Sequence, residues 1–443
     1  MKVTFIQPAV GKKPGQRYIG TWKMEPLTIA TLAALTPPEI DIEVQDDRIE
    51  LIDYGADTDI VAMSVETYTA LRTYDIADRF RDRGVKVVLG GYHTTLAPDE
   101  AMGHADAIVT ASAEATWPSL LDDYRRGQLK ARYDGSPGPA AVLPRRSVYA
   151  GKKYLPITLA EVGRGCGHRC EFCAIASYYG PSYHPRDIDA ISADIASAPH
   201  KFHFIVDDNV VARRSHAMGW MKAIEKSGIV WAGQGTLTMA RDTALLQQMY
   251  KSGCRIILIG FESLNDANLA QMGKSWEQAI GERDELVRRI HDAGLGIYAT
   301  FVFGFDQDDE RSFSDTVEFA LKHKFYTAAF NHLLPYPGTG TYDRLAEQGR
   351  LLYDRWWLAR DYSYGDLAFR PATMSPDRMS ELCREARHEF ARLGHVFGRG
   401  AAALKRAGLP HWWVYWLMNL RLGEEIDQKM HVPLAGNLDE LPK

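Results

Sequence analysis

Cysteine is scarce in this chain, and most of it is gathered in one place. The 443 residues contain five cysteines, three of which, Cys166, Cys170 and Cys173, fall within eight positions. Cysteines distributed in this way do not indicate the set of disulfide bonds that stabilises a small secreted domain. We therefore expect a reduced compartment, the cytoplasm.

Long apolar runs and a strong charge of one sign are also missing. The longest apolar run, residues 412–418, is far shorter than the roughly 20 residues that a membrane-spanning helix needs. The first ten residues read as a strand and lack the extended apolar region of a signal peptide. The formal net charge of −5 gives no general attraction to nucleic acid. A cytoplasmic protein without a membrane span or a nucleic-acid partner is expected.

The first third of the chain alternates apolar strand-like segments with helical ones. Helices are expected over 27–35, 70–83 and 118–126. Strands are expected over 3–6, 40–44, 60–65, 85–89 and 107–109. Strands separated by helices favour a doubly wound parallel sheet, in which ligands bind beyond the carboxyl ends of the strands. Residues 1–134 are therefore predicted to be a Rossmann-like domain of α/β class.

A second series of strands follows a linker rich in glycine and proline, residues 135–155. The six strand candidates are 157–162, 203–207, 229–236, 255–261, 296–304 and 327–334, with helices such as 243–251 and 276–293 between them. Six βα units are too few for a closed eight-fold barrel, so residues 156–342 are predicted to form a partial (β/α)6 barrel. Residues 343–443 are expected to be a helical, aromatic-rich region.

The three clustered cysteines have the spacing C-x3-C-x2-C and follow the strand expected over 157–162. Three thiolates on one loop can ligate three irons of a [4Fe–4S] cluster and leave the fourth iron open. The alternative is a Cys3His zinc site that uses His168. Zinc ligands come more often as two separated pairs, and neither Cys254 nor Cys383 supplies a second pair. We expect those two to be ordinary buried thiols.

The cysteine loop, with Phe172 before its last cysteine, resembles that of the radical S-adenosylmethionine (SAM) superfamily, and the six-unit barrel matches it. Further stretches resemble the subgroup with an N-terminal cobalamin-binding domain. They are 88–93, 113–118, 204–209, 259–263, 303–306 and 335–339. The resemblance covers about residues 1–350.

This resemblance implies a radical enzyme. Cys166, Cys170 and Cys173 would ligate the cluster, and the amino and carboxylate groups of SAM would bind its open iron. One electron from an external reductant such as flavodoxin or ferredoxin then cleaves a C–S bond of SAM and releases a 5′-deoxyadenosyl radical. The cofactors carry that chemistry, and the protein orients and shields them.

The resemblance also implies which strand ends contact SAM. Asp207, Asp208 and Asn209 end the second barrel strand and match the contact to the methionine end, although Asp208 or Asn209 would equally cap a helix. The remaining candidates are Glu262 and Ser263 after the fourth strand, Phe172 near the adenine, Gln234 on the third strand and Gly304 after the fifth. For Phe172 the alternative is plain packing within the loop.

Cobalamin would lie at the carboxyl edge of the N-terminal sheet. Gly90 and Gly91 would let the backbone approach its nucleotide tail, Ser64 would hydrogen-bond the tail, and His93 would face the metal. A tight turn is the alternative for the glycine pair, and solvent exposure for His93. Glu114 is the last residue of Ala-Ser-Ala-Glu, where members of the subgroup often have Gly-Glu-Gly-Glu. No Asp-x-His-x-x-Gly run supplies a lower histidine ligand.

The resulting hypothesis is a cobalamin-dependent radical SAM methyltransferase that acts on an unactivated carbon of a small molecule or natural product. The alternative within the family is radical rearrangement, cyclisation or oxidation, with cobalamin as redox partner or absent. An alternative of another class is a zinc-stapled binding protein. The sequence identifies neither the substrate nor a catalytic side chain.

The C-terminal region is unusually aromatic. Its aromatic residues include Trp356, Trp357, Tyr362, Tyr364, Trp412, Trp413 and Trp416. We expect them to pack onto the barrel mouth. The alternatives are the lining of a hydrophobic or aromatic substrate pocket and contact with a membrane surface.

Overall fold

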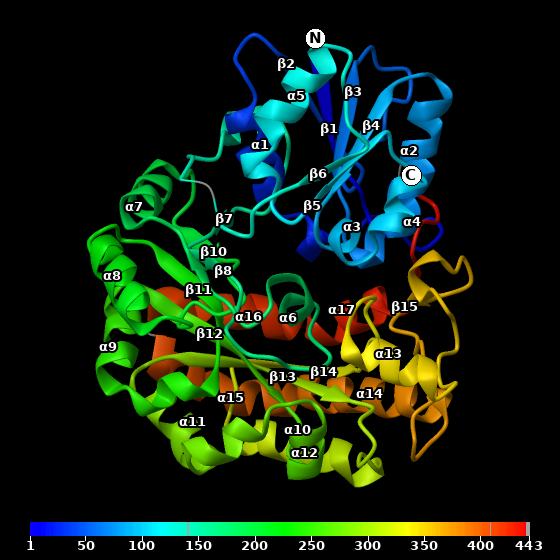
Figure 1. Ribbon diagram of the computed structural model, residues 1–443. Helices are drawn as coiled ribbons and strands as arrows, with labels where there is room; N and C mark the ends of the chain where they lie inside the picture. The colour runs from blue at the N-terminus through cyan, green and yellow to red at the C-terminus, as the bar shows by residue number, and fades with distance from the viewer. Residues whose placement is uncertain (140, 408, 440–443) are drawn as a thin grey trace.

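The computed structural model describes residues 1–139, 141–407 and 409–439, and its framework is two six-stranded parallel sheets (Figure 1). The N-terminal sheet lies above the barrel sheet, and the helical C-terminal region closes the side of the barrel. The predicted fold class, a Rossmann-like sheet followed by a partial barrel and a helical region, is confirmed.

The N-terminal sheet has the strand order β2-β1-β3-β4-β5-β6, with every pair parallel. Its strands are β1 Lys2–Gln7, β2 Asp41–Asp46, β3 Ile60–Ser64, β4 Lys86–Gly90, β5 Ala107–Thr110 and β6 Arg132–Asp134. The short edge strand β6 was not predicted from the sequence. Only its central residue, Tyr133, is buried, so it lacks the apolar run that marks the inner strands.

Helices cover both faces of this sheet because neighbouring residues of a strand point to opposite sides. Phe5 packs with α1 (Leu27–Leu35) and α5 (Trp117–Arg125), whereas its neighbour Ile6 packs with α2 (Ala70–Asp82). Two short helices, α3 (Tyr92–Leu96) and α4 (Pro98–Met102), follow β4. Continuous burial of strands such as β3 is what a sheet covered on both faces requires.

The barrel sheet has the order β14-β13-β12-β11-β10-β7, again all parallel. Its strands are β7 Thr158–Ala160, β10 Phe202–Ile205, β11 Val230–Gly235, β12 Cys254–Glu262, β13 Gly296–Phe303 and β14 Thr327–His332. All six lie at the predicted positions. Cys254 and Cys383 are buried, as expected.

Six of the helices between these strands pack on the outside of the barrel sheet and share its core. They are α7 Ile188–Ser197, α8 Arg214–Ile224, α9 Thr243–Lys251, α10 Asp266–Gln271, α11 Arg283–Asp292 and α12 Glu310–Lys322. Helix α6 Ala174–Tyr179 has no buried residue and contacts α3 instead. The single helix expected over 276–293 is wrong. It is divided at Gly281, whose φ of +126° no helix can adopt.

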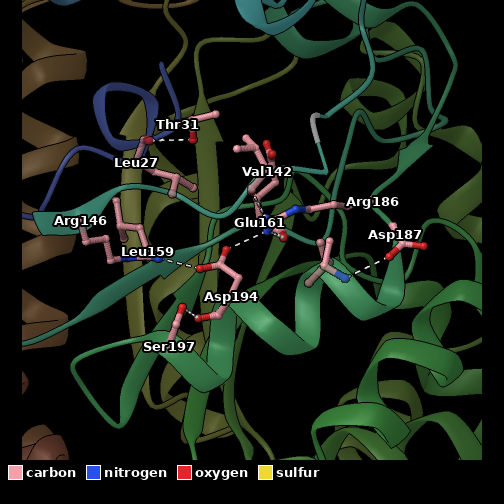
Figure 2. A network of polar contacts seen from close by, with 12 residues as sticks. Leu27, Thr31, Val142, Arg146, Leu159, Glu161, Arg186, Asp187, Asp194 and Ser197 are labelled. Carbon is pink, nitrogen blue, oxygen red and sulfur yellow. Dashed lines mark hydrogen bonds and ion pairs between the residues drawn. The ribbon is translucent and has the colours of Figure 1, made fainter. Parts of the chain in front are cut away.

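The linker is fixed to the barrel by a buried carboxylate, that of Asp194 on α7 (Figure 2). Arg146 of the linker donates to Asp194 at 2.6 Å and to the carbonyl of Leu159 at 2.8 Å. Arg186 donates to the other oxygen of Asp194 at 2.7 Å and to the carbonyl of Val142 at 2.7 Å. Charge-assisted bonds of this kind are strong when they are buried, so the linker is not a free tether.

The described residues of the C-terminal region form helices, as predicted, and also a small antiparallel pair of strands that was not predicted. These elements are α13 Gly340–Glu347, α14 Pro376–Ala391, α15 Leu393–Ala407, α16 Leu409–Leu420, α17 Leu422–Lys429, β15 Ser363–Tyr364 and β16 Val432–Pro433. Residues 408 and 440–443 lie outside the described residues. None of the helices that the structure describes is long and apolar enough to cross a membrane.

The end of the chain returns to the N-terminal domain (Figure 1). The amide of Gly11 donates to the carbonyl of Leu434 at 3.0 Å. Arg72 on α2 is 3% exposed and donates to the buried Asp47 at 2.9 Å and to Asp439 at 2.9 Å. Trp356 and Trp357 are buried in the same N-terminal core. The C-terminal region therefore joins the two domains.

We expect Arg72→Met to destabilise the protein by about 3–5 kcal/mol, because it leaves the buried Asp47 carboxylate without its cation. Asp439→Asn should cost about 1 kcal/mol or less, since the Asp439 side chain is 51% exposed. Thermal unfolding of the two variants measures the difference. Equal shifts would show that the buried pair contributes nothing of its own.

Candidate functional site

A cavity of about 640 Å³ lies between the carboxyl edge of the N-terminal sheet and the first strands of the barrel. Its N-terminal wall includes Ser64, Gly90, Gly91, Tyr92 and Glu114. Its barrel wall includes Leu159, Glu161, Arg164, Tyr178, Tyr179 and Val206. Segments from both domains thus enclose one space at the sheet edge where parallel α/β folds bind ligands.

The cysteine loop lies directly beside this cavity, between Arg164 and helix α6. Asp208 accepts a hydrogen bond from the amide of Gly165 at 3.0 Å, and the side-chain amide of Asn209 donates to the carbonyl of Cys166 at 3.4 Å. Gly165 has a φ of +83°, and a Cβ there would lie 2.3 Å from the carbonyl oxygen of Ser182. Only glycine fits this turn. Asp208 and Asn209 therefore hold the shape of the loop.

The three thiols of the loop are mostly buried near one another. Burial raises the pKa of the Cys166 thiol and that of the Cys173 thiol above the usual value for cysteine. It raises the pKa of Cys170 to about 12. Repulsion by the Cys173 thiolate also raises the pKa of Cys166 and of Cys170, and the Cys166 thiolate raises that of Cys170. Bound iron would supply the positive charge that three thiolates in this place require, so the donor set fits an iron–sulfur cluster.

His168, the fourth ligand in the zinc alternative, stacks on Trp276 with ring centroids 4.2 Å apart and an angle of 11° between the rings. Burial lowers the pKa of His168. In the described part of the chain, no group of three His, Cys, Asp or Glu side chains is arranged to hold a single metal ion.

Glu262 ends β12 in a left-handed backbone conformation, with a φ of +59°. Non-glycine residues adopt this conformation at a cost of order 1 kcal/mol or more, and they keep it where the surroundings enforce it. The strand pairing is irregular between Gly260 and Glu262, and the Glu262 carboxylate lies 3.6 Å from Lys274, which is 5% exposed. Its ammonium also donates to the carbonyl of Gly260 at 2.7 Å and contacts Glu277 at 2.8 Å.

The Lys274 ammonium is therefore a fixed buried cation beside the cysteine loop. Burial opposes its charge, but the carboxylates of Glu262 and Glu277 and the nearby Cys170 thiolate raise the pKa of Lys274 above its usual value. Sequence reasoning identified Glu262 and missed both Lys274 and Glu277. The only trace of this site in the sequence is the lysine directly after Met272-Gly273. Because lysine is almost never fully buried, its residue type alone gave no reason to place it inside the protein.

The other residues predicted to contact SAM are distributed around the same strand ends. Asp207 is 3% exposed and accepts from the amide of Val162 at 2.8 Å, while its second oxygen has no partner among the described residues. Gln234 is exposed, and Phe172 packs edge-on to Phe305 at 6.1 Å.

Two of the predicted SAM contacts have structural partners. Ser263 accepts from the amide of Asn265 at 3.1 Å, in the turn that begins α10. Gly304 has a φ of +116°, its amide donates to Asp308 at 2.8 Å, and a Cβ there would lie 2.7 Å from the ring of Phe369. Packing against protein therefore already explains the glycine at 304.

Four of the five residues predicted to contact cobalamin line the cavity: Ser64, Gly90, Gly91 and Glu114. Gly91 has a φ of +97°, and a Cβ there would lie 2.7 Å from Oγ of Ser64 and 2.9 Å from the amide nitrogen of Val65. Glu114 is ion-paired with Arg164. Packing against Ser64 and Val65 therefore already explains the glycine at 91, whereas a Cβ at Gly90 would lie 3.6 Å or more from its nearest neighbours.

His93 lies away from the cavity lining. It is fully buried, with Nε2 2.9 Å from Glu100 and Nδ1 3.3 Å from the hydroxyl of Thr67. Glu100 also accepts from the indole of Trp357 at 3.0 Å. Both ring nitrogens of His93 are thus used in a network that joins the N-terminal domain to the C-terminal region.

Residues 160–320 match the model of the Radical SAM superfamily, and the matched region contains the cysteine loop and the barrel. Over these residues the chain is similar to the radical SAM superfamily. This confirms the resemblance that the cysteine spacing and the strand-end motifs indicated.

Curated relatives and solved structures extend over most of the chain. The chain is 28% identical to the bacteriochlorophyllide d C-12(1)-methyltransferase of Chlorobaculum tepidum over 412 residues, 89% of this chain and 87% of the relative. It is 29% identical to the C-8(2)-methyltransferase of the same organism over 354 residues, 74% and 78% of the two chains. The fold matches a solved structure of TsrM, a radical SAM methyltransferase from Kitasatospora setae, with cobalamin and a [4Fe–4S] cluster bound. The TM-score is 0.66 and the sequence identity 13%, and the match covers 96% of this chain and 99% of TsrM.

We expect Lys274→Met to lower stability by about 3–5 kcal/mol, because two buried carboxylates then lose their shared cation. Glu277→Gln should cost less, since Glu262 keeps its partner. Thermal unfolding, compared with Lys251→Met at an exposed helix end, measures the effect. A shift no larger than that of Lys251→Met would contradict the assigned role.

Proposed function

We propose that this protein is a cobalamin-dependent radical SAM methyltransferase that adds a methyl group to an unactivated carbon of a small molecule. The observation that carries the proposal is the shared cavity. At one wall lie Arg164, Tyr178 and Tyr179, which flank the cysteine loop, and at the other lies the glycine-lined carboxyl edge of a Rossmann-like sheet. The relatives named as methyltransferases cover most of the chain, and the TsrM structure contains both cofactors in the same fold.

The residues present suit these cofactors in different ways. Cys166, Cys170 and Cys173 would hold the cluster, and Gly90 and Gly91 would admit cobalamin close to the backbone. When bound, the cluster and SAM supply a radical that removes hydrogen from the substrate, and cobalamin supplies the methyl group. The surrounding side chains exclude water from this space and orient the substrate.

Tyrosines dominate the part of the cavity region near the C-terminal strands. Tyr364 lines the cavity and contacts Tyr68 and Trp22, with ring centroids 5.1 and 5.3 Å apart. Burial raises the pKa of the Tyr68, Tyr336 and Tyr364 hydroxyls above the usual value for tyrosine. These hydroxyls therefore stay neutral at physiological pH. Neutral aromatic walls with hydroxyl groups favour a hydrophobic or aromatic substrate with a few polar atoms.

The decisive experiment is anaerobic reconstitution with iron and sulfide, with and without cobalamin, followed by turnover with SAM and a chemical reductant or flavodoxin. We expect a methylated product together with S-adenosylhomocysteine and 5′-deoxyadenosine. Candidate substrates should be lipophilic and aromatic, and the tetrapyrroles named for the relatives are the first to test.

The products distinguish the alternatives. Formation of 5′-deoxyadenosine alone, with an isomerised, cyclised or oxidised product, would replace methyl transfer by the other radical outcome. About one zinc and no iron or sulfide in anaerobically purified protein would contradict the enzyme assignment. Cys170→Ala should abolish the visible absorbance of the cluster without unfolding the protein.

Gly91→Ala should reduce cobalamin binding by about ten-fold or more, because the added methyl group meets Ser64 and the backbone of Val65. The matched control is Gly127→Ala, at a φ of +70° with no atom within 4 Å of the added Cβ. It also places alanine at a positive φ, but without the collision. Retained cobalamin is read from the visible spectrum after gel filtration. Equal retention by both variants would place the cofactor elsewhere.

A further inference from the structure

The helical hairpin α15–α16, drawn in orange and red in Figure 1, exposes apolar side chains where a surface helix normally exposes polar ones. On α15 the exposed positions from 393 to 404 hold only leucine, phenylalanine, glycine and alanine. Leu393 and Phe397 are each 60% exposed. On α16, among the described side chains from 412 to 420, the exposed ones are Trp413, Leu417, Met418 and Leu420.

These residues are not a displaced part of the core, because the opposite side of the hairpin already packs on the barrel. Tyr415 and Val396 are fully buried there with Tyr326, and the Tyr415 hydroxyl donates to the carbonyl of Val396 at 2.5 Å. The two helices pack against each other through Phe397 and Trp416, whose ring centroids are 5.1 Å apart. The apolar surface therefore continues from one helix to the other on the side that faces solvent.

The charge of this segment is opposite to that of the protein. Residues 390–423 contain no aspartate or glutamate and five cationic residues, at positions 392, 399, 405, 406 and 421. The segment thus carries +5 while the whole chain carries −5, which leaves −10 on the remainder. Arg421, which follows the hairpin, is exposed, whereas Arg392 is ion-paired with Glu389 at 3.1 Å and Arg399 is buried.

We propose that the α15–α16 hairpin docks on an anionic lipid bilayer, with Phe397, Trp413 and Leu417 inserted among the headgroups. A tryptophan- and leucine-rich face on a segment of net positive charge is the arrangement that binds helices flat to such surfaces. Each cation near an anionic leaflet adds about 1 kcal/mol of attraction. A second copy of the chain is a poorer occupant, because two faces of the same positive charge repel.

Flotation of the full-length protein with vesicles tests this surface. We expect binding to phosphatidylcholine vesicles that contain about 30% phosphatidylglycerol, and much weaker binding to pure phosphatidylcholine. Raising the salt from about 0.1 to 0.5 M should weaken the binding, since it screens the cations. The double variant Phe397→Glu/Leu417→Glu should reduce the bound fraction about ten-fold or more, because it removes apolar contact and adds negative charge.

The matched control is Leu51→Glu/Leu143→Glu, which places the same charges at leucines that are 41% and 44% exposed elsewhere. It should bind vesicles as the wild type does, and both variants should keep the wild-type circular dichroism and unfolding temperature. The proposal is overturned if the wild type binds no anionic vesicles or binds neutral ones equally well. It is also overturned if the control loses binding as strongly as the hairpin variant. A wild-type dimer that Phe397→Glu/Leu417→Glu converts to monomer, without vesicle binding, would assign the face to self-association instead.

Discussion

One guanidinium group, that of Arg164, links the two domains directly at the cavity. It bonds Glu161 at 2.6 Å on the barrel side and Glu114 on the N-terminal side, directly before the cysteine loop begins. All three side chains are mostly buried and line the cavity. A buried cation between two carboxylates is stable only while both remain in place. The same ion pairs therefore fix the position of one domain against the other, the start of the cysteine loop and the wall of the cavity.

The rest of the site follows from the direction of the strands. Both sheets are parallel, so in each sheet the polar residues that end the strands gather at one edge. The two edges meet at the cavity, which places Ser64 and the glycine pair of β4 opposite Glu161 and Val206. The third fixed element is Lys274, a buried cation that pairs with Glu262, whose backbone conformation the chain alone disfavours. Buried cations thus lie on both sides of the cysteine loop, at Arg164 and at Lys274.

Periodicity and motif spacing were enough to predict both sheets, the cysteine loop and the strand-end residues, because these features depend on neighbours along the chain. They did not predict contacts that fold distant segments together. The pair of Arg164 with Glu114 spans 50 positions, and the bond of Arg72 to Asp439 spans 367. His93 shows the same limit: its place after a strand suggested a metal-facing residue, but Glu100 and Trp357 draw it into a buried network.

The C-terminal region shows how one segment can serve both packing and exposure. Trp356 and Trp357 are buried in the N-terminal core and Tyr364 lines the cavity, whereas Trp413 is 48% exposed. All of these aromatic residues were expected to pack onto the barrel mouth, and composition alone could not separate the groups. The difference lies in their partners. The first group fills the junction between the domains, and the hairpin has only one face to bury. An amphipathic helix whose buried face is already satisfied must present its other face to a second environment, and here that face is apolar and cationic.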